Sequence, residues 1–112
     1  MTDARAARLA ENETRFRDIN ERMSEGLRPV ARPDEQLPFI CECGALDCKD
    51  TVALTPTEYE LVRADSRDFA IVPGHDVPEV EDVIGGEDQR YAIVRKKLPG
   101  DRIAQETDPR SS

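Results

Sequence analysis

The amino-acid sequence predicts a small α+β fold that combines an N-terminal amphipathic helix, a small antiparallel sheet and one helix packed on the sheet. Two observations predict this class: apolar residues recur at helical spacing before residue 27, and short strand-like runs bounded by turn residues follow residue 38. The chain has 112 residues, of which 38% are hydrophobic and 36% are charged. Because so little apolar surface is available, the core must be small and an additional staple is expected.

Residues 1–27 are expected to form the N-terminal helix. Leu9, Phe16, Ile19, Met23 and Leu27 follow one another at spacings of seven, three, four and four residues, which places them along one narrow helical stripe. On the polar side, acidic residues at positions 11, 13 and 18 each precede an arginine by four residues. This is the favourable order for exposed side-chain pairs on a helix, so these residues are expected to face solvent.

The narrow stripe is typical of the contact seam of a coiled coil, and Phe16, Ile19 and Met23 are therefore candidate partner-binding residues. Two interpretations stay open. The helix packs on its own domain, or it binds another protein, which includes a second copy of the chain in a homodimer.

The rest of the chain divides into three parts. Residues 28–37 are expected to form a semi-extended linker, because prolines at positions 29, 33 and 38 restrict the backbone. Residues 38–97 are expected to form the compact α+β domain. Residues 98–112 have little apolar content and end in two serines, so they are expected to form a disordered tail.

The first half of the compact domain has clear strand and helix signals. Residues 39–43 and 50–54 have the composition of two short strands that flank a turn. Thr55 and Glu58 have the spacing of a capping box, and the proline between them suits the first helical position. A helix is therefore predicted over residues 56–65.

The second half is expected to be mostly strand. Residues 68–72 form a predicted strand that leads into a Pro-Gly turn. Residues 77–84 fit either helical spacing or a strand, but a Gly-Gly break and a second β-branched run after it favour a hairpin.

The residues that bind soft metal ions are concentrated in two turns. Cys41, Cys43 and Cys48 are all the cysteines of the chain, and its only histidine, His75, follows the Pro-Gly turn. Three thiolates and one imidazole are a common structural ligand set for Zn²⁺, which is soft enough for sulfur and takes four ligands. We therefore expect a zinc site that staples the sheet. An iron–sulfur cluster is the alternative, although such clusters normally take four thiolates, or two thiolates with two histidines.

Charge and motif content exclude several classes of function. The net charge of −8 repels nucleic-acid phosphates and anionic lipids, so a protein partner is expected and neither nucleic acid nor a membrane is. The chain has no membrane-length apolar run and no signal-peptide pattern, and its odd cysteine count favours the reducing cytoplasm. Nucleotide-binding and hydrolase motifs are also missing, so an enzyme is not expected.

Four blocks of the sequence resemble a family of small, functionally uncharacterised bacterial proteins, mainly from actinobacteria. The blocks are residues 16–21 (FRDINE), 39–43 (FICEC), 54–63 (LTPTEYELVR) and 69–75 (FAIVPGH). The resemblance implies a compact C-x-C…C…P-G-H module that follows an N-terminal helix. It implies no particular reaction.

These observations together predict a small cytoplasmic zinc-binding protein that acts without catalysis, as a protein-interaction or regulatory module. The alternative is a thiol-based redox or zinc sensor, in which Cys41, Cys43 and Cys48 release the metal when they are oxidised.

Overall fold

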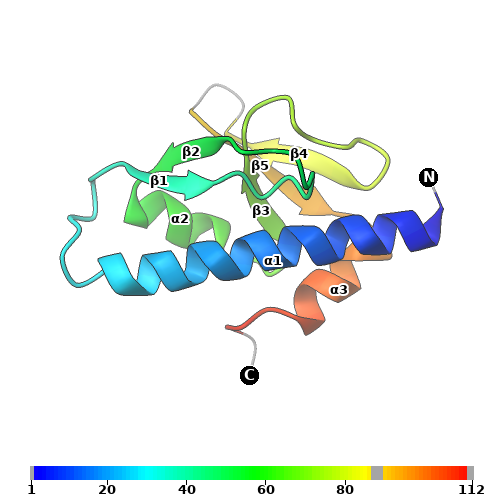
Figure 1. Cartoon of the computed structure of the whole chain (residues 1–112), viewed down its shortest axis with the longest axis horizontal. Coiled ribbons are helices and arrows are strands. Elements are labelled where there is room, and N and C mark those ends of the chain that lie inside the picture. Colours follow the sequence, from blue (N-terminus) through cyan, green and yellow to red (C-terminus); the bar gives the residue numbers. More distant parts are fainter. Residues whose placement is uncertain (1, 87–89, 111–112) are drawn as a thin grey trace.

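The structure, a computed structural model, describes residues 2–86 and 90–110 and confirms the α+β class. Its elements are α1 (Asp3–Leu27), β1 (Leu37–Ile40), β2 (Thr51–Leu54), α2 (Pro56–Val62), β3 (Asp68–Ile71), β4 (Glu81–Gly85), β5 (Ala92–Lys96) and α3 (Gly100–Glu106). Figure 1 shows α1 extending along the molecule, with both sheets on one side of it. Within the described ranges, no helix has the length and apolar content needed to cross a membrane.

The strands form two antiparallel sheets, where the sequence predicts a single one. β1 pairs with β2, and β5 lies between β3 and β4 in a three-stranded sheet. The hairpin prediction is confirmed, because β4 and β5 pair directly with an irregularity between Val83 and Gly85. The strand predicted over residues 39–43 already ends at Ile40, so the following cysteines lie outside the ladder.

The start of α2 confirms the predicted capping box. The Thr55 hydroxyl accepts a hydrogen bond from the Glu58 backbone N–H at 3.1 Å, and the Glu58 carboxylate accepts one from the Thr55 N–H at 2.8 Å. The helix ends at Val62, earlier than the predicted end at residue 65. Glu58 is therefore accounted for by its capping role.

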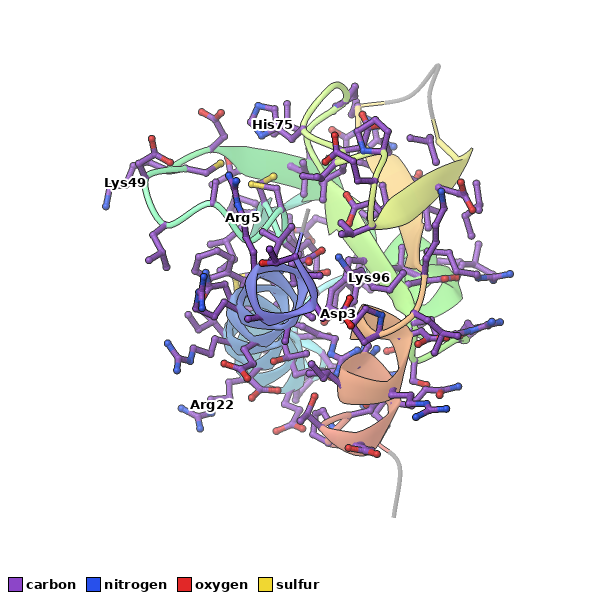
Figure 2. The ribbon with its side chains drawn as sticks, turned by 90° about the vertical axis from the view of Figure 1, so that its right-hand side faces the viewer. Asp3, Arg5, Arg22, Lys49, His75 and Lys96 are labelled. Carbon is purple, nitrogen blue, oxygen red and sulfur yellow. The ribbon has the colours of Figure 1, made fainter. Side chains whose placement is uncertain are left out.

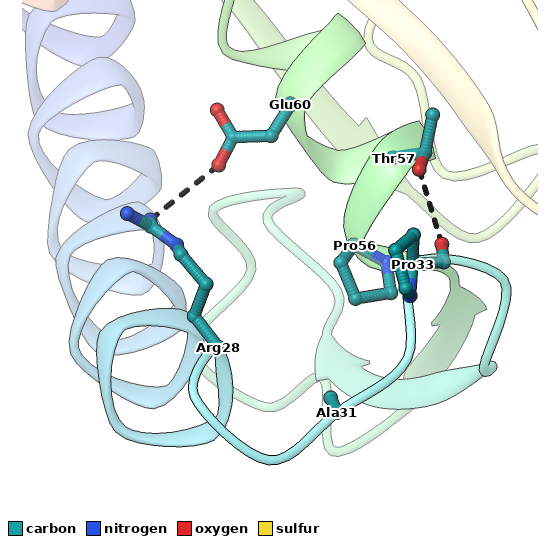
Figure 3. Close-up of a pocket in the computed structure, with 6 residues that line it drawn as sticks. All are labelled: Arg28, Ala31, Pro33, Pro56, Thr57 and Glu60. Carbon is teal, nitrogen blue, oxygen red and sulfur yellow. Dashed lines mark hydrogen bonds and ion pairs between the residues drawn. The ribbon is translucent and has the colours of Figure 1, made fainter.

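The proline-containing segment before β1 lies against the start of α2 (Figure 3). The Thr57 hydroxyl donates a hydrogen bond to the Pro33 carbonyl at 3.1 Å, and the Arg28 guanidinium lies 3.4 Å from the Glu60 carboxylate. These residues, with Ala31, surround an open hollow of about 300 Å³ that contains no thiol and no imidazole. Its lining offers no chemistry that points to a ligand.

The face that α1 turns toward the rest of the protein is mainly polar, although the sequence predicts an apolar one. Of the predicted stripe, Met23 and Leu27 do pack against a core cluster. A helix of this length spans about 37 Å, close to the longest dimension of the molecule, which is 42 Å. Ile19, in the predicted apolar stripe, is 50% exposed instead. The buried positions of α1 are Ala6, Ala10, Glu13, Thr14, Arg17, Asn20, Glu21 and Ser24.

The expected solvent-exposed pair at positions 13 and 17 is therefore wrong. Glu13 accepts a hydrogen bond at 2.7 Å from Lys96, the last residue of β5, whose side chain points toward α1 (Figure 2). Arg17 donates to the Ala104 carbonyl at 2.9 Å and lies over the Phe69 ring, 4.8 Å from its centroid. Both charged groups are fully buried because residues distant in the sequence provide their partners.

The expected disordered tail is also wrong for residues 98–110, while residues 111–112 lie outside the described part. α3 packs against α1, and its residue Ala104 is fully buried in the core cluster that contains Cys41 and Cys43. Beyond α3, the buried Asp108 accepts a hydrogen bond from Arg63 at the end of α2. Arg110 lies 2.8 Å from the Glu21 carboxylate of α1. Polar contacts hold this segment in place although it has little apolar content.

The buried apolar residues form two clusters. One surrounds the stacked rings of Phe39 and Tyr59, whose centroids are 4.5 Å apart. The other contains Cys41 and Cys43 together with apolar residues of β3 and β5. Two of the three cysteines are thus part of the core.

Candidate metal centre

The structure brings together the four residues that the sequence proposes as metal ligands. Cys41 and Cys43 follow β1, Cys48 lies in the loop before β2, and His75 lies in the turn after β3. One ligand atom from each of the four lies within 4.8 Å of all the others. The two earlier cysteines are buried, while Cys48 and His75 are partly exposed. The four residues form a potential metal-binding site near the surface.

The end of β1 explains how Cys41 and Cys43 reach the same site. Side chains two residues apart on a regular strand lie on the same face. Here β1 ends at Ile40, and one more backbone hydrogen bond, from the Cys41 N–H to the Asp50 carbonyl at 3.0 Å, precedes the turn. The chain then turns at Gly44, whose φ of +82° is a left-handed conformation that favours glycine. We call residues 41–44 the cysteine knuckle.

Gly44 also brings the cysteine knuckle into direct contact with α1. A Cβ atom at this position would lie 2.7 Å from the Leu9 Cδ1 atom and 2.8 Å from the Glu13 Cγ atom, which are clashing distances. The Asn12 side-chain amide donates a hydrogen bond to the Gly44 carbonyl at 3.1 Å. Only a glycine fits between the knuckle and the helix here.

Backbone N–H groups point at the sulfur atoms. The Val72 N–H donates a hydrogen bond to Cys41 Sγ at 3.2 Å. The Ala45 N–H acts in the same way on Cys43, and the Asp50 N–H on Cys48. Such donors stabilise thiolates, the form in which cysteine binds metal ions.

The three thiols differ in acidity. A hydrogen bond from the Cys41 side chain lowers the pKa of Cys43 to about 5. The pKa of Cys41 is raised, because its proton is held in that bond and because the thiol is buried. Burial also raises the pKa of Cys48. A cation that binds here would displace the remaining protons, so its affinity should depend on pH.

One nitrogen of the His75 imidazole faces the thiols, and the other faces Asp50. Nδ1 lies 3.6 Å from Cys41 Sγ and 3.7 Å from Cys48 Sγ, and Nε2 lies 3.7 Å from an Asp50 carboxylate oxygen. The turn is closed by a hydrogen bond of 3.0 Å from the His75 N–H to the Val72 carbonyl. Nδ1 is therefore the nitrogen placed to bind a metal ion.

The donor set fits a single tetrahedral ion. With metal–sulfur distances of about 2.3 Å, donor atoms round such an ion are about 3.8 Å apart. The four donors already lie close to that spacing, all within 4.8 Å of one another. Small shifts of the partly exposed Cys48 and His75 would complete the geometry.

Sequence reasoning missed two residues that hold the cysteine knuckle in place, Asn20 on α1 and Glu42 between the two cysteines. Both are fully buried. The Asn20 side chain accepts a hydrogen bond from the Ile40 N–H and donates one to the Ile40 carbonyl, each at 2.9 Å. The signal available in the sequence was an asparagine inside a helix, where amide side chains are uncommon unless they have a specific partner.

The three residues proposed to contact a partner are not grouped as one exposed patch. Ile19 is exposed, and Phe16 is half-buried. Met23 is also half-buried and packs against the cluster around Phe39. Of the three, only Ile19 lies mainly at the surface.

Comparison with known proteins provides no family assignment. No protein-family model matches the chain, and no curated protein or solved structure matches it either.

Proposed function

We propose that the protein is a zinc-binding module without catalytic activity, which acts through protein contacts in a reducing compartment. The observation that carries the proposal is the convergence of three sulfur atoms and His75 Nδ1 within 4.8 Å. The backbone N–H groups directed at the sulfurs support it, because they favour the thiolates that zinc requires.

Zinc accounts for this geometry better than an iron–sulfur cluster. A cluster distributes its protein ligands over at least two iron ions, so that some donor atoms lie far apart. Here every pair of donors is close enough to share one ion. Zinc also has no geometric preference beyond four-coordination, which suits a site assembled from three separate segments.

A structural role for the zinc follows from the number of ligands. Catalytic zinc sites have three protein ligands and leave one position open for water or substrate, whereas this site has four. The chain has no second histidine that would transfer protons at the metal. Two of the ligands belong to a core cluster, as expected for a metal that stabilises the fold.

Substitution of His75 tests the zinc site directly. We expect His75→Ala to weaken zinc binding by more than the roughly 10- to 100-fold cost of losing an outer-shell partner, because one of four ligands is lost. His75→Cys should restore most of the affinity, since a thiolate also suits a tetrahedral site. Native mass spectrometry gives the stoichiometry, and competition with a chromophoric chelator gives the affinity. A wild-type protein that folds without zinc and has no measurable affinity for it would refute the proposal.

The outer face of α1 is the proposed site of protein contact. Ile19 is 50% exposed there, and Arg15 and Arg22 lie exposed on the same face. Neither arginine forms an ion pair within the described part of the chain. An exposed apolar residue between unpaired cations is suited to a partner surface that has acidic and apolar groups.

Ile19→Ser separates this role from internal packing. Because Ile19 lies mainly at the surface, we expect the variant to keep its zinc content and to melt within a few degrees of wild type. Binding of a partner, or a homodimer measured by light scattering, should be lost. Leu61→Ser is the matched control, because Leu61 is 67% exposed on α2. If Ile19→Ser and Leu61→Ser behave alike in all three measurements, α1 is not the contact face.

A further inference from the structure

The cysteine knuckle is held between two elements of the fold. On one side, Asn20 of α1 forms two hydrogen bonds with the backbone of Ile40, as a neighbouring strand would. On the other side, the Glu42 N–H donates a hydrogen bond to the Ala70 carbonyl of β3 at 2.9 Å. The backbone that carries Cys41 and Cys43 is therefore fixed from both sides.

The Glu42 side chain connects these two sides. One carboxylate oxygen accepts a hydrogen bond from the Asn20 amide at 2.8 Å, and the other accepts one from the Ala70 N–H at 2.9 Å. The carboxylate is fully buried, so these bonds are its compensation for the loss of water. Because Glu42 lies between two of the metal ligands in sequence, a shift of its backbone would displace both Cys41 and Cys43.

The contact between α1 and the knuckle depends on hydrogen-bond geometry more than on apolar area. Asn20 binds Ile40, immediately before the knuckle, and the Glu42 carboxylate within it, while Asn12, two turns earlier on α1, binds its end at Gly44. Polar contacts of this kind require a defined backbone conformation on the other side. A metal ion at the cysteines would hold the knuckle in that conformation.

We propose that Asn20 and Glu42 form the outer shell of the metal centre, so that zinc binding and the docking of α1 are coupled. The inference rests on the proposed zinc site and extends it to a helix that provides no ligand. Coupling is reciprocal: if zinc tightens the docking of α1, the docked helix tightens zinc binding by the same factor. A variant that weakens the contact between α1 and the knuckle should therefore also weaken zinc binding.

The test compares two neighbouring residues of α1. Asn20 contacts the knuckle, whereas Glu21, also buried, binds Arg63 and Arg110 instead. We expect Asn20→Ala to lower the zinc affinity about 10- to 100-fold, the usual effect of removing an outer-shell partner. Glu21→Ala should change it less than about threefold, although it removes buried ion pairs and lowers stability at least as much.

The measurements are zinc affinity by chelator competition and the absorption spectrum of the cobalt(II)-substituted protein. The cobalt bands report ligand geometry, so they should shift in Asn20→Ala and stay unchanged in Glu21→Ala. Equal losses of affinity with unchanged bands in both variants would overturn the inference, because zinc binding would then follow only the overall stability.

Hydrogen exchange on the wild-type protein provides a second measurement that needs no variant. Removal of zinc should lower the protection of α1 amides near Asn12 and Asn20, and unchanged protection would overturn the inference.

If Asn20→Ala does not fold, Asn12→Ala replaces it, because it removes a single hydrogen bond to the knuckle. If the wild-type protein binds zinc and neither asparagine variant changes the affinity, only the proposed coupling is wrong. A wild-type protein that binds no zinc would defeat the proposed function as well.

Discussion

Removal of zinc is expected to lower the melting temperature of the protein by about 15–25 °C, the shift that about 4 kcal/mol produces in a domain of this size. A ligand held at about 1,000 times its Kd adds that much to the free energy of unfolding. The physical reason is that Cys41 and Cys43 belong to a core cluster with Phe69 and Ile71, so the metal joins buried segments distant in the sequence.

Thermal unfolding followed by circular dichroism, with and without a strong zinc chelator, measures this effect. The control is a Cys41→Ser, Cys43→Ser double variant, which has no complete site to lose and should melt at the same temperature with or without the chelator. If mass spectrometry shows that zinc has left the wild-type protein and the melting temperature has not changed, the structural role is wrong.

The second large effect is expected from Lys96→Met, which we predict to lower the free energy of unfolding by about 3–5 kcal/mol. The Lys96 ammonium donates hydrogen bonds to Glu13 at 2.7 Å and to Glu81 at 3.1 Å, and all three side chains are fully buried. Methionine has a similar volume but no charge, so the carboxyl groups of Glu13 and Glu81 would remain buried without the ammonium group that donates to both.

Lys97→Met is the matched control at the next position. Lys97 is exposed, and its ammonium lies 3.3 Å from the Asp82 carboxylate at the surface, where an ion pair contributes about 0–1 kcal/mol. Urea unfolding of both variants at neutral pH measures the difference. Similar small losses in the two variants would contradict the buried network described for α1.

The buried group formed by Lys96, Glu13 and Glu81 can also be tested through the pH dependence of stability. Burial, and then the nearby Glu81 carboxylate, raise the pKa of Glu13 well above its ordinary value near 4.5. The folded protein therefore keeps this proton over a pH range in which the unfolded chain has lost it. The contribution of Glu13 to stability is fully present below the ordinary pKa and is lost as the pH rises through the raised one. Glu13→Gln removes this dependence, so the wild type should lose stability relative to Glu13→Gln as the pH rises.

Features that depend on residue type at short range can be predicted from the amino-acid sequence. Thr55 and Glu58 specify the start of α2, because a capping box needs only residues three apart. The hairpin of β4 and β5 follows from two β-branched runs around a glycine break. Cys41, Cys43, Cys48 and His75 were identified as a set because they are all the thiols and imidazoles of the chain.

The buried face of α1 and the packing of the C-terminal segment depend on contacts that form only in the folded protein. Helical periodicity identifies an apolar stripe, and it assumes that charged residues remain in water. Glu13 and Arg17 are buried instead. Lys96 compensates the desolvation of Glu13, and the Ala104 carbonyl compensates that of Arg17, each from more than eighty residues away in the sequence. Asn20 likewise has its role only where Ile40 and Glu42 lie beside it. Burial of a polar group depends on partners that folding brings close, and the spacing of residues along the chain does not predict which partners these are.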